Sequence, residues 1–178
     1  MTSTKAIAAA SVSELEALVS AVDDEQLAAV ARVFVEAPRL FFSGVGRSGL
    51  SARAVAMRLM HIGKVAYVVG EATTPAIAQG DAFIMFTSSG RGSILDQAKT
   101  AQSRTARLVS FTSAPNELSA MSEAVVEVPA RTRVPTHQHA GSLFEQGCLI
   151  IGDALCRTVQ ETMGVPSTEL DARHANIL

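Results

Sequence analysis

Short, continuous apolar runs alternate with helical patterns from residue 39 to residue 163, and this alternation constrains the fold more than any other feature of the sequence. A run in which nearly every residue is apolar predicts a strand that is buried on both faces. Strands of this kind, separated by helices, are typical of a parallel sheet covered by helices on both sides. The sequence therefore predicts an α/β fold, with one sheet of five parallel strands between two helical layers.

The positions of these runs give the expected elements. Five buried strands are expected at residues 39–43, 65–69, 81–87, 106–112 and 124–128. Helices are expected at residues 49–62, 93–102 and 141–163, and a short polar tail follows at 167–178. In parallel sheets of this type, ligands bind beyond the carboxyl ends of the strands, where the strand order reverses. The turns that follow the strands are therefore the first place to look for a site.

Residues 1–37 predict two helices of a different character. Ser11 or Ser13 is the expected cap of the first core-facing stretch, and Asp23 begins the second helix, which Pro38 stops. These residues carry no pattern that is typical of chemistry, which favours a helical arm that packs or forms oligomers. Residues 38–178 are expected to form the main domain, and the two parts together a single globular unit.

Composition narrows the class of protein. The 178 residues are 48% hydrophobic and 18% charged, with one tyrosine and no tryptophan, so we expect a homo-oligomer that buries apolar surface between copies. A net charge of −2 without a basic stripe disfavours nucleic-acid binding, and no apolar run is long enough to span a membrane. The N-terminus lacks a secretory pattern, and Cys148 and Cys156 have neither metal nor disulfide spacing. We therefore expect a cytoplasmic protein with two buried thiols.

The first strand runs into a glycine-rich turn, GVGRSG at 44–49, which opens a helix. Backbone amides in the first turn of a helix have no partner within the helix, and the helix dipole attracts negative charge to them. Gly44, Gly46 and Gly49 let a ligand approach the backbone, and Ser48 adds a hydroxyl. The turn predicts a phosphate site, although the spacing alone fits an ordinary βα turn equally well.

A second turn of the same kind, TSSGRGS at 87–93, follows the third expected strand and again opens a helix. The hydroxyls of Ser88, Ser89 and Ser93 and those of the first turn can converge on one anion, which is a more specific signal than either turn alone. The Walker A pattern is absent. The glycines at 44, 46 and 49 fit the dinucleotide spacing, so a nucleotide stays an alternative, which the second serine turn disfavours.

A base is needed if a bound sugar phosphate is to react, because isomerisation through an enediol begins with removal of a carbon-bound proton. Glu145, in the first turns of the last helix, has apolar neighbours that would strip water from a carboxylate and strengthen it as a base. The alternative is a carboxylate that only complements the helix dipole. Glu71 and Thr73, in the loop after the second strand, either line the site or belong to a simple turn.

The histidines are weaker candidates for the catalytic base than Glu145. His61 ends a helix, where a cation suits the dipole. His174, near the C-terminus, either belongs to a frayed tail or closes over the site of a neighbouring subunit. His137 and His139 flank one residue in a loop, but no third ligand lies at a recognisable spacing, so we expect no metal.

With these residues the chain resembles the sugar isomerase (SIS) domain family and, within it, the 6-phospho-3-hexuloisomerases. The resemblance covers about residues 40–178 and matches the N-terminal helices in kind only. The segments that carry it are GVGRSGLSARAVAMRLMHIG, YVVGEATTPAIAQGD, TSSGRGS, GSLFEQ and RHANIL, in this order.

The resemblance implies a flavodoxin-like three-layer sandwich for the SIS domain at 38–178, usually in a tetramer, and no cofactor. It implies the interconversion of 3-hexulose 6-phosphate and fructose 6-phosphate through an enediol. This reaction belongs to the ribulose monophosphate route of formaldehyde fixation, where 3-hexulose-6-phosphate synthase is the functional partner.

The same resemblance assigns roles to single residues. The base falls on Glu145, and His174 resembles the residue that reaches the site of a neighbouring subunit. In the mechanism that we expect from these residues, His61 or His174 assists proton transfer or ring opening. Arg47 orients substrate oxygens or pairs with a carboxylate. The family's second turn commonly reads SGSGET, so Arg91 is a departure that either points away or adds a phosphate contact. The substrate and its phosphate fall to the two serine turns and the loop after the second strand: Gly46, Arg47, Ser48, Ser88, Ser89, Ser93, Glu71 and Thr73.

Two alternatives stay open. One is a non-catalytic SIS module that senses a sugar phosphate, which the lack of a DNA-binding segment and the presence of a plausible base disfavour. The other is a different SIS isomerase, acting for example on sedoheptulose or arabinose phosphates.

Overall fold

A computed structural model describes residues 2–177 and shows one sheet of five parallel strands. The strand order is β2-β1-β3-β4-β5, which is the flavodoxin-like order. The predicted α/β sandwich is therefore confirmed. The strands are β1 (Arg39–Gly44), β2 (Val65–Val68), β3 (Ala82–Phe86), β4 (Arg107–Thr112) and β5 (Ala124–Glu127).

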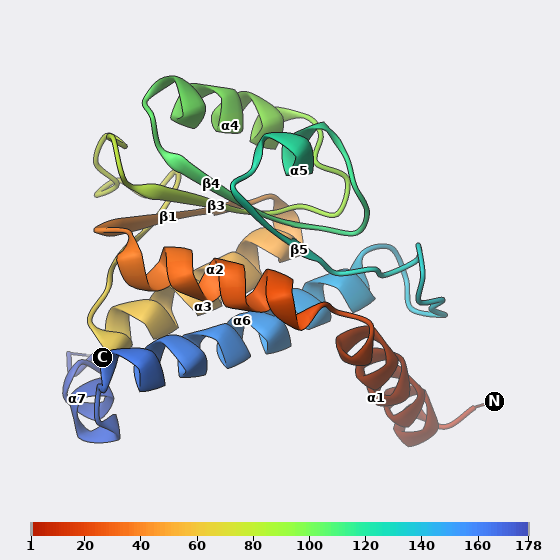
Figure 1. The fold of residues 1–178 in the computed structure, drawn as a ribbon. Coiled ribbons are helices and arrows are strands. Elements are labelled where there is room, and N and C mark those ends of the chain that lie inside the picture. The colour runs from red at the N-terminus through yellow and green to blue at the C-terminus, as the bar shows by residue number, and fades with distance from the viewer. Residues whose placement is uncertain (1, 178) are drawn as a thin grey trace.

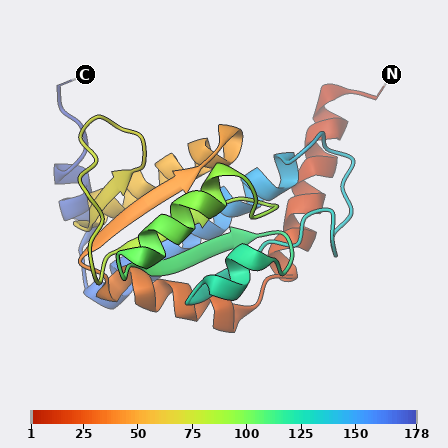
Figure 2. The ribbon, with the colours of Figure 1, turned by 90° about the horizontal axis from the view of Figure 1, so that it is seen from above.

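Helices cover both faces of the sheet (Figure 1). One layer holds α2 (Asp24–Glu36), α3 (Gly46–Ile62) and α6 (Ser142–Met163), and the other holds α4 (Ser93–Ser103) and α5 (Glu117–Met121). The view from above shows α1 (Thr4–Ser20) at one end of the molecule, and α7 (Ser167–Ala172) at the other (Figure 2). No helix within residues 2–177 is long and apolar enough to cross a membrane.

Several expected boundaries are wrong, each for a local reason. The cap of α1 is Ser3, whose side chain accepts from the amide of Ala6, whereas Ser11 and Ser13 lie inside the helix and donate to carbonyls four residues earlier. The first crossover helix begins at Gly46 rather than at residue 49, because the turn after β1 is tighter than expected. The stretch 167–178 contains the short helix α7 and is not simply a polar tail.

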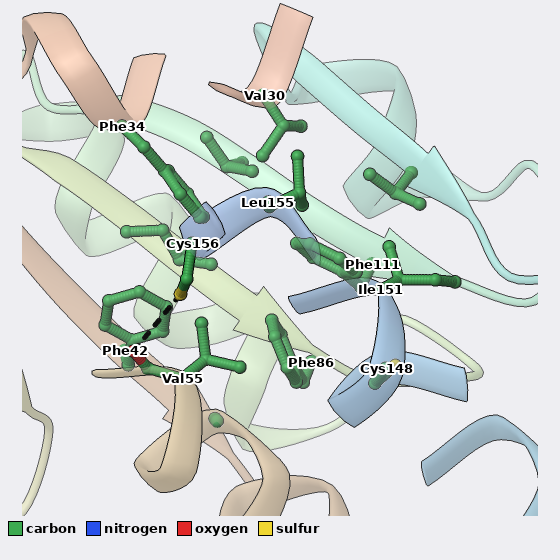
Figure 3. Close-up of a cluster of buried hydrophobic side chains, with 14 of the residues drawn as sticks. Val30, Phe34, Phe42, Val55, Phe86, Phe111, Cys148, Ile151, Leu155 and Cys156 are labelled. Carbon is green, nitrogen blue, oxygen red and sulfur yellow. Dashed lines mark hydrogen bonds between the residues drawn. The ribbon is translucent and has the colours of Figure 1, made fainter. Parts of the chain in front are cut away.

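The larger core lies between the sheet and the layer of α2, α3 and α6 (Figure 3). The rings of Phe86 and Phe111 lie 4.3 Å apart between centroids, and Phe42 packs edge-on against Phe86. The thiol of Cys156 lies 3.8 Å from the carbonyl oxygen of Val55, and burial raises its pKa to about 12. Cys148 is also free and buried, so both cysteines are the buried thiols that the sequence predicts.

The strand order reverses between β1 and β3, and this is where the two serine- and glycine-rich turns leave the sheet. Gly44, the last residue of β1, stands beside Phe86, the last residue of β3. The chain turns into α3 at Gly44 with very little room, because a Cβ atom on Gly44 would lie 2.8 Å from the amide nitrogen of Gly49. A Cβ atom on Gly49 would lie closer still to the carbonyl oxygen of Gly44. Both positions therefore require glycine.

We expect Gly49→Ala to lower the free energy of unfolding by about 1–3 kcal/mol, because the added methyl group meets backbone that cannot move aside without shifting α3. Chemical denaturation measures the loss. Ser48→Ala, in the same turn, is the control and is expected to change the free energy by less than about 0.5 kcal/mol. Equal stabilities of Gly49→Ala and the wild type would show that this contact does not limit the turn.

Candidate active site

Helices α3, α4 and α6 begin at the carboxyl edge of the sheet, after β1, β3 and β5, and the short helix α5 begins there after β4. Their first turns supply backbone amides without intrahelical partners, and their dipoles place partial positive charge at the same edge. An anion is therefore favoured here before any side chain is considered.

A cavity of about 370 Å³ lies at this edge. Its lining combines hydroxyl groups with a single charged side chain, that of Arg131, and with the apolar start of α6. Hydroxyls and one cation, without a carboxylate in the lining, suit an anionic ligand. The lining residues are Ser88, Ser89, Ser113, Ala130, Arg131, Thr132, Thr136, Ala140, Gly141, Leu143 and Phe144.

The structure divides the predicted serines between two cavities. Ser88 and Ser89 line the cavity of about 370 Å³, whereas Ser93 lines a separate one of about 460 Å³ between α4 and the loop after β2. The turn with Gly46 and Ser48 leaves the sheet beside the Ser88–Ser89 turn. The two turns are therefore neighbours, but Ser93 does not share a cavity with the other two serines.

Glu145 belongs to the first turn of α6, and its side chain is 14% exposed. One of its carboxylate oxygens pairs with the guanidinium of Arg47, from the turn after β1. Its backbone oxygen accepts a hydrogen bond of 3.0 Å from Ser51 of α3. Its carboxylate is therefore held in place by the turn that also leads to the expected phosphate site.

The second carboxylate oxygen of Glu145 lies close to Gly141, which lines the serine cavity, although Glu145 itself is not among the lining residues. A Cβ atom on Gly141 would come within 3.0 Å of Oε1 of Glu145, and Gly141 itself lines that cavity. Arg47 and Glu145 also line a smaller cavity of about 180 Å³ on the α3 side. The carboxylate thus stands beside the serine cavity rather than at a distance from it. The sequence predicts apolar neighbours for this carboxylate, and the structure adds an ion pair with Arg47.

The other two predicted residues of the loop after β2 do not line the serine cavity. Glu71 is exposed and pairs with Arg53 of α3, and Thr73 is exposed. Arg91, the departure from the family's turn, is also exposed and is absent from the lining of that cavity.

His61 and His174 lie at the opposite end of α3 from Arg47. The fourteen helical steps from Arg47 to His61 correspond to roughly 21 Å along the helix. The two imidazoles stack on each other with ring centroids 4.1 Å apart, and Arg173 donates a 3.1 Å hydrogen bond to the carbonyl of His61. Within one chain, neither histidine can assist at Glu145, so any such role requires a second subunit.

Comparisons with known proteins show the family to which this chain belongs. A family model described as SIS domain matches residues 33–145. The chain belongs to the SIS domain family. The 3-hexulose-6-phosphate isomerase of Mycobacterium gastri is 40% identical to this SIS protein, over 88% of this chain and 82% of the relative. The enzyme of the same name from Bacillus subtilis is 32% identical, over 92% and 93%.

A solved structure also resembles this chain over nearly its whole length. The crystal structure of a Methanococcus jannaschii protein, for which a molecular function of 3-hexulose-6-phosphate isomerase was inferred, superposes on this chain with a TM-score of 0.84. The two sequences are 27% identical, and the match covers 95% of this chain and 97% of the other.

Sequence reasoning missed the contribution of the loop between β5 and α6. Arg131, Thr132 and Thr136 of this loop line the serine cavity, as does Ser113 at the end of β4. A signal was present, because these residues also follow the carboxyl ends of strands. His137 and His139 belong to the same loop. Among residues 2–177, no group of three or more His, Cys, Asp or Glu side chains could hold a metal ion.

The burial of His61 predicts a pH-dependent stability for this SIS protein. Its side chain is 2% exposed, and its Nδ1 has no hydrogen-bond partner among the described residues. Burial lowers the pKa of His61, and the neighbouring His174 and Arg58 lower it further. The folded protein therefore holds a neutral imidazole where the unfolded chain takes up a proton.

We expect the wild type to lose stability as the pH falls through about 6.5, because below that pH the unfolded state binds the His61 proton more readily. His61→Phe keeps a ring against His174 but cannot titrate, so its free energy of unfolding should fall less between pH 7.5 and 5.5. Denaturant titrations across this range measure the difference. His139→Phe, at an exposed position, is the control. If His61→Phe showed the wild-type slope, burial would not govern the ionisation of His61.

Proposed function

We propose that this chain is an isomerase that interconverts 3-hexulose 6-phosphate and fructose 6-phosphate. The observation that carries the proposal is the position of Glu145, a mostly buried carboxylate beside a hydroxyl-lined cavity at the carboxyl edge of the sheet. Such a cavity suits the phosphate, and such a carboxylate suits the proton transfer. The names of the relatives from Mycobacterium gastri and Bacillus subtilis support this choice of substrate.

The phosphate is held by the serine turns and by nearby backbone amides. Ser88 and Ser89 offer hydroxyls from the start of the β3–α4 connection, and Ser48 and the amides after Gly46 lie on the neighbouring turn. Charge-assisted hydrogen bonds from hydroxyl and amide groups are well suited to phosphate oxygens. The phosphate therefore fixes one end of the substrate while its carbons extend toward α6.

The chemistry is a proton transfer between two adjacent carbons. The carboxylate of Glu145 removes the proton from C2 of 3-hexulose 6-phosphate, and the electron pair of that C–H bond forms a C2=C3 double bond. The carbonyl oxygen on C3 takes up a proton, which gives a 2,3-enediol. Glu145 then returns its proton to C3, while the hydroxyl on C2 loses its proton and becomes the new carbonyl. All electrons stay within the substrate, so the reaction as written needs no cofactor.

Arg47 has two uses in this reaction. Its guanidinium pairs with the Glu145 carboxylate and orients it before the substrate binds. Its side chain is 63% exposed and therefore has room to turn toward an oxygen on C2 or C3, where a cation stabilises the charge of an enediolate.

We also propose a homo-oligomer, as a tetramer. Apolar side chains stand exposed along one side of α3, with Leu50 at 64%, Met57 at 53% and Met60 at 40%, and a second copy would cover them. In such an assembly His174 of a neighbouring subunit can reach the site that it cannot reach in its own chain.

The cellular setting follows from the same substrate. We place the reaction in the ribulose monophosphate route of formaldehyde fixation, with 3-hexulose-6-phosphate synthase supplying the substrate. The cytoplasm is the proposed location, because two free thiols are typical of a reducing compartment.

We expect Glu145→Gln to reduce kcat by about 100-fold or more, because the amide cannot accept the C2 proton. Binding of fructose 6-phosphate should remain. The assay offers hexulose phosphate, made from formaldehyde and ribulose 5-phosphate, and measures fructose 6-phosphate. Glu161→Gln, at the other end of α6, is the matched control and should keep the wild-type rate.

The same assay separates the alternatives. A Glu145→Gln variant with near-normal turnover would remove Glu145 as the base. A wild type that binds fructose 6-phosphate without converting it would be a sensor. A wild type that instead converts a different sugar phosphate, in a panel including sedoheptulose and arabinose phosphates, would be another isomerase of the family.

We expect the double variant Ser88→Ala, Ser89→Ala to raise the Kd for fructose 6-phosphate about tenfold or more, because hydrogen bonds to a charged group are lost. Calorimetry measures the Kd. Ser93→Ala distinguishes the two cavities as phosphate sites, since Ser93 lines the cavity of about 460 Å³. A larger effect of Ser93→Ala than of the double variant would move the phosphate to that cavity.

A further inference from the structure

The loop between β5 and α6 lines much of the serine cavity but has little structure of its own. One isolated bridge, between Ala130 and Val134, is its only β pairing within the described residues. Further along, at residues 135–138, the backbone has no ladder or helix to join. Contacts with residues outside the loop therefore contribute to holding this part in place.

Glu14 of α1 supplies that hold. Its Oε1 accepts a hydrogen bond of 2.9 Å from the backbone amide of His137. Its Oε2 accepts hydrogen bonds of 2.6 Å from the hydroxyl of Thr136 and 3.1 Å from the side-chain amide of Gln138. All three donors belong to the loop. The views from the side and from above both show the loop beside α1 (Figures 1 and 2).

The hydrogen bonds of Glu14 affect the lining of the cavity in two ways. Thr136 lines the cavity directly. Gln138, held by Glu14 through its side chain, uses its backbone oxygen to accept a 2.7 Å hydrogen bond from Arg131, the charged residue of the cavity lining. Arg131 also has a φ of +62°, a conformation that costs energy for a residue with a side chain and persists only where its surroundings enforce it.

The position of Glu14 is itself fixed by the core. Leu18, one helical turn further along α1, is fully buried. Its side chain fills the space where Gly147 of α6 has no side chain, two residues after Glu145. Because residues four apart lie on the same side of a helix, the face that buries Leu18 also presents Glu14 to the loop.

We propose that Glu14 is a positioning residue, which latches the β5–α6 loop so that Thr136 and Arg131 stand ready at the substrate cavity. This inference rests on the proposed function for its kinetic consequence, but not for the latch itself. It gives α1, which lies outside the matched residues 33–145, a part in the site. The hydrogen bonds from His137, Thr136 and Gln138 favour the charged carboxylate and lower the pKa of Glu14, in agreement with a latch made by an ionised group.

The first experiment tests the latch without any substrate. Arg131 and Arg133 are exposed trypsin sites in the loop. We expect trypsin to cut there at least about tenfold faster in Glu14→Ala than in the wild type, because several hydrogen bonds that close the loop are lost. Glu16→Ala, which changes an exposed acid on the same helix, should be cut at the wild-type rate. Equal cleavage of Glu14→Ala and Glu16→Ala would overturn the latch.

The second experiment tests positioning. With the isomerase assay, Glu14→Ala should raise KM about tenfold while kcat changes less than about threefold, since the base is untouched. Glu14→Gln keeps one acceptor oxygen and should fall between Glu14→Ala and the wild type, and it serves if Glu14→Ala does not fold. The KM of the double variant Glu14→Ala, Thr136→Ala should not exceed that of the more impaired single variant, because the two residues act through one contact.

The two experiments fail in different ways. Fast cleavage with an unchanged KM would overturn positioning and leave only a structural latch. A wild type without isomerase activity would overturn the proposed function, whereas the cleavage comparison would still decide whether Glu14 holds the loop. Additive effects in the double variant would show that Glu14 does not act through Thr136.

Discussion

The close contact between Gly44 and Gly49 is the constraint on which the rest of the site depends. It lets α3 begin immediately after β1, with the amides of its first turn at the carboxyl edge of the sheet. Arg47 lies inside this turn and reaches Glu145 on α6. A looser turn would move Arg47 away from Glu145 and away from the neighbouring Ser88–Ser89 turn. One backbone contact thus sets the relative position of the proposed phosphate site and the proposed base, Glu145.

The site is also a meeting point of segments that are distant in the sequence. The serine turn comes from the middle of the chain, Glu145 from the last long helix and Glu14 from the first helix. Parallel strands explain the first two, since their carboxyl ends share one edge. The position of Glu14 depends instead on Leu18, which packs α1 against Gly147, two residues after Glu145. The N-terminal helix is therefore tied to the loop that lines the cavity.

The sequence was sufficient for the sheet, for α3, α4 and α6 and for the turns at the switch point, because continuous apolar runs and glycine-rich turns are local signals. The short helix α5 between β4 and β5 was not expected. The sequence could not show that Ser93 faces a different cavity from Ser88 and Ser89, since that depends on how α4 is rotated on the sheet. The latch at Glu14 was equally hidden, because its partners lie more than a hundred residues away. His61 and His174 resembled site residues by type, but the length of α3 separates them from Glu145 in one chain.

A crystal structure of the protein with fructose 6-phosphate tests the central claim most directly, namely that one edge of the sheet holds both the phosphate and the base. The account predicts the phosphate beside Ser88 and Ser89, with C2 and C3 of the sugar within roughly 3–3.5 Å of the Glu145 carboxylate. A phosphate bound beside Ser93 and Thr74, with the sugar carbons out of reach of Glu145, would contradict it.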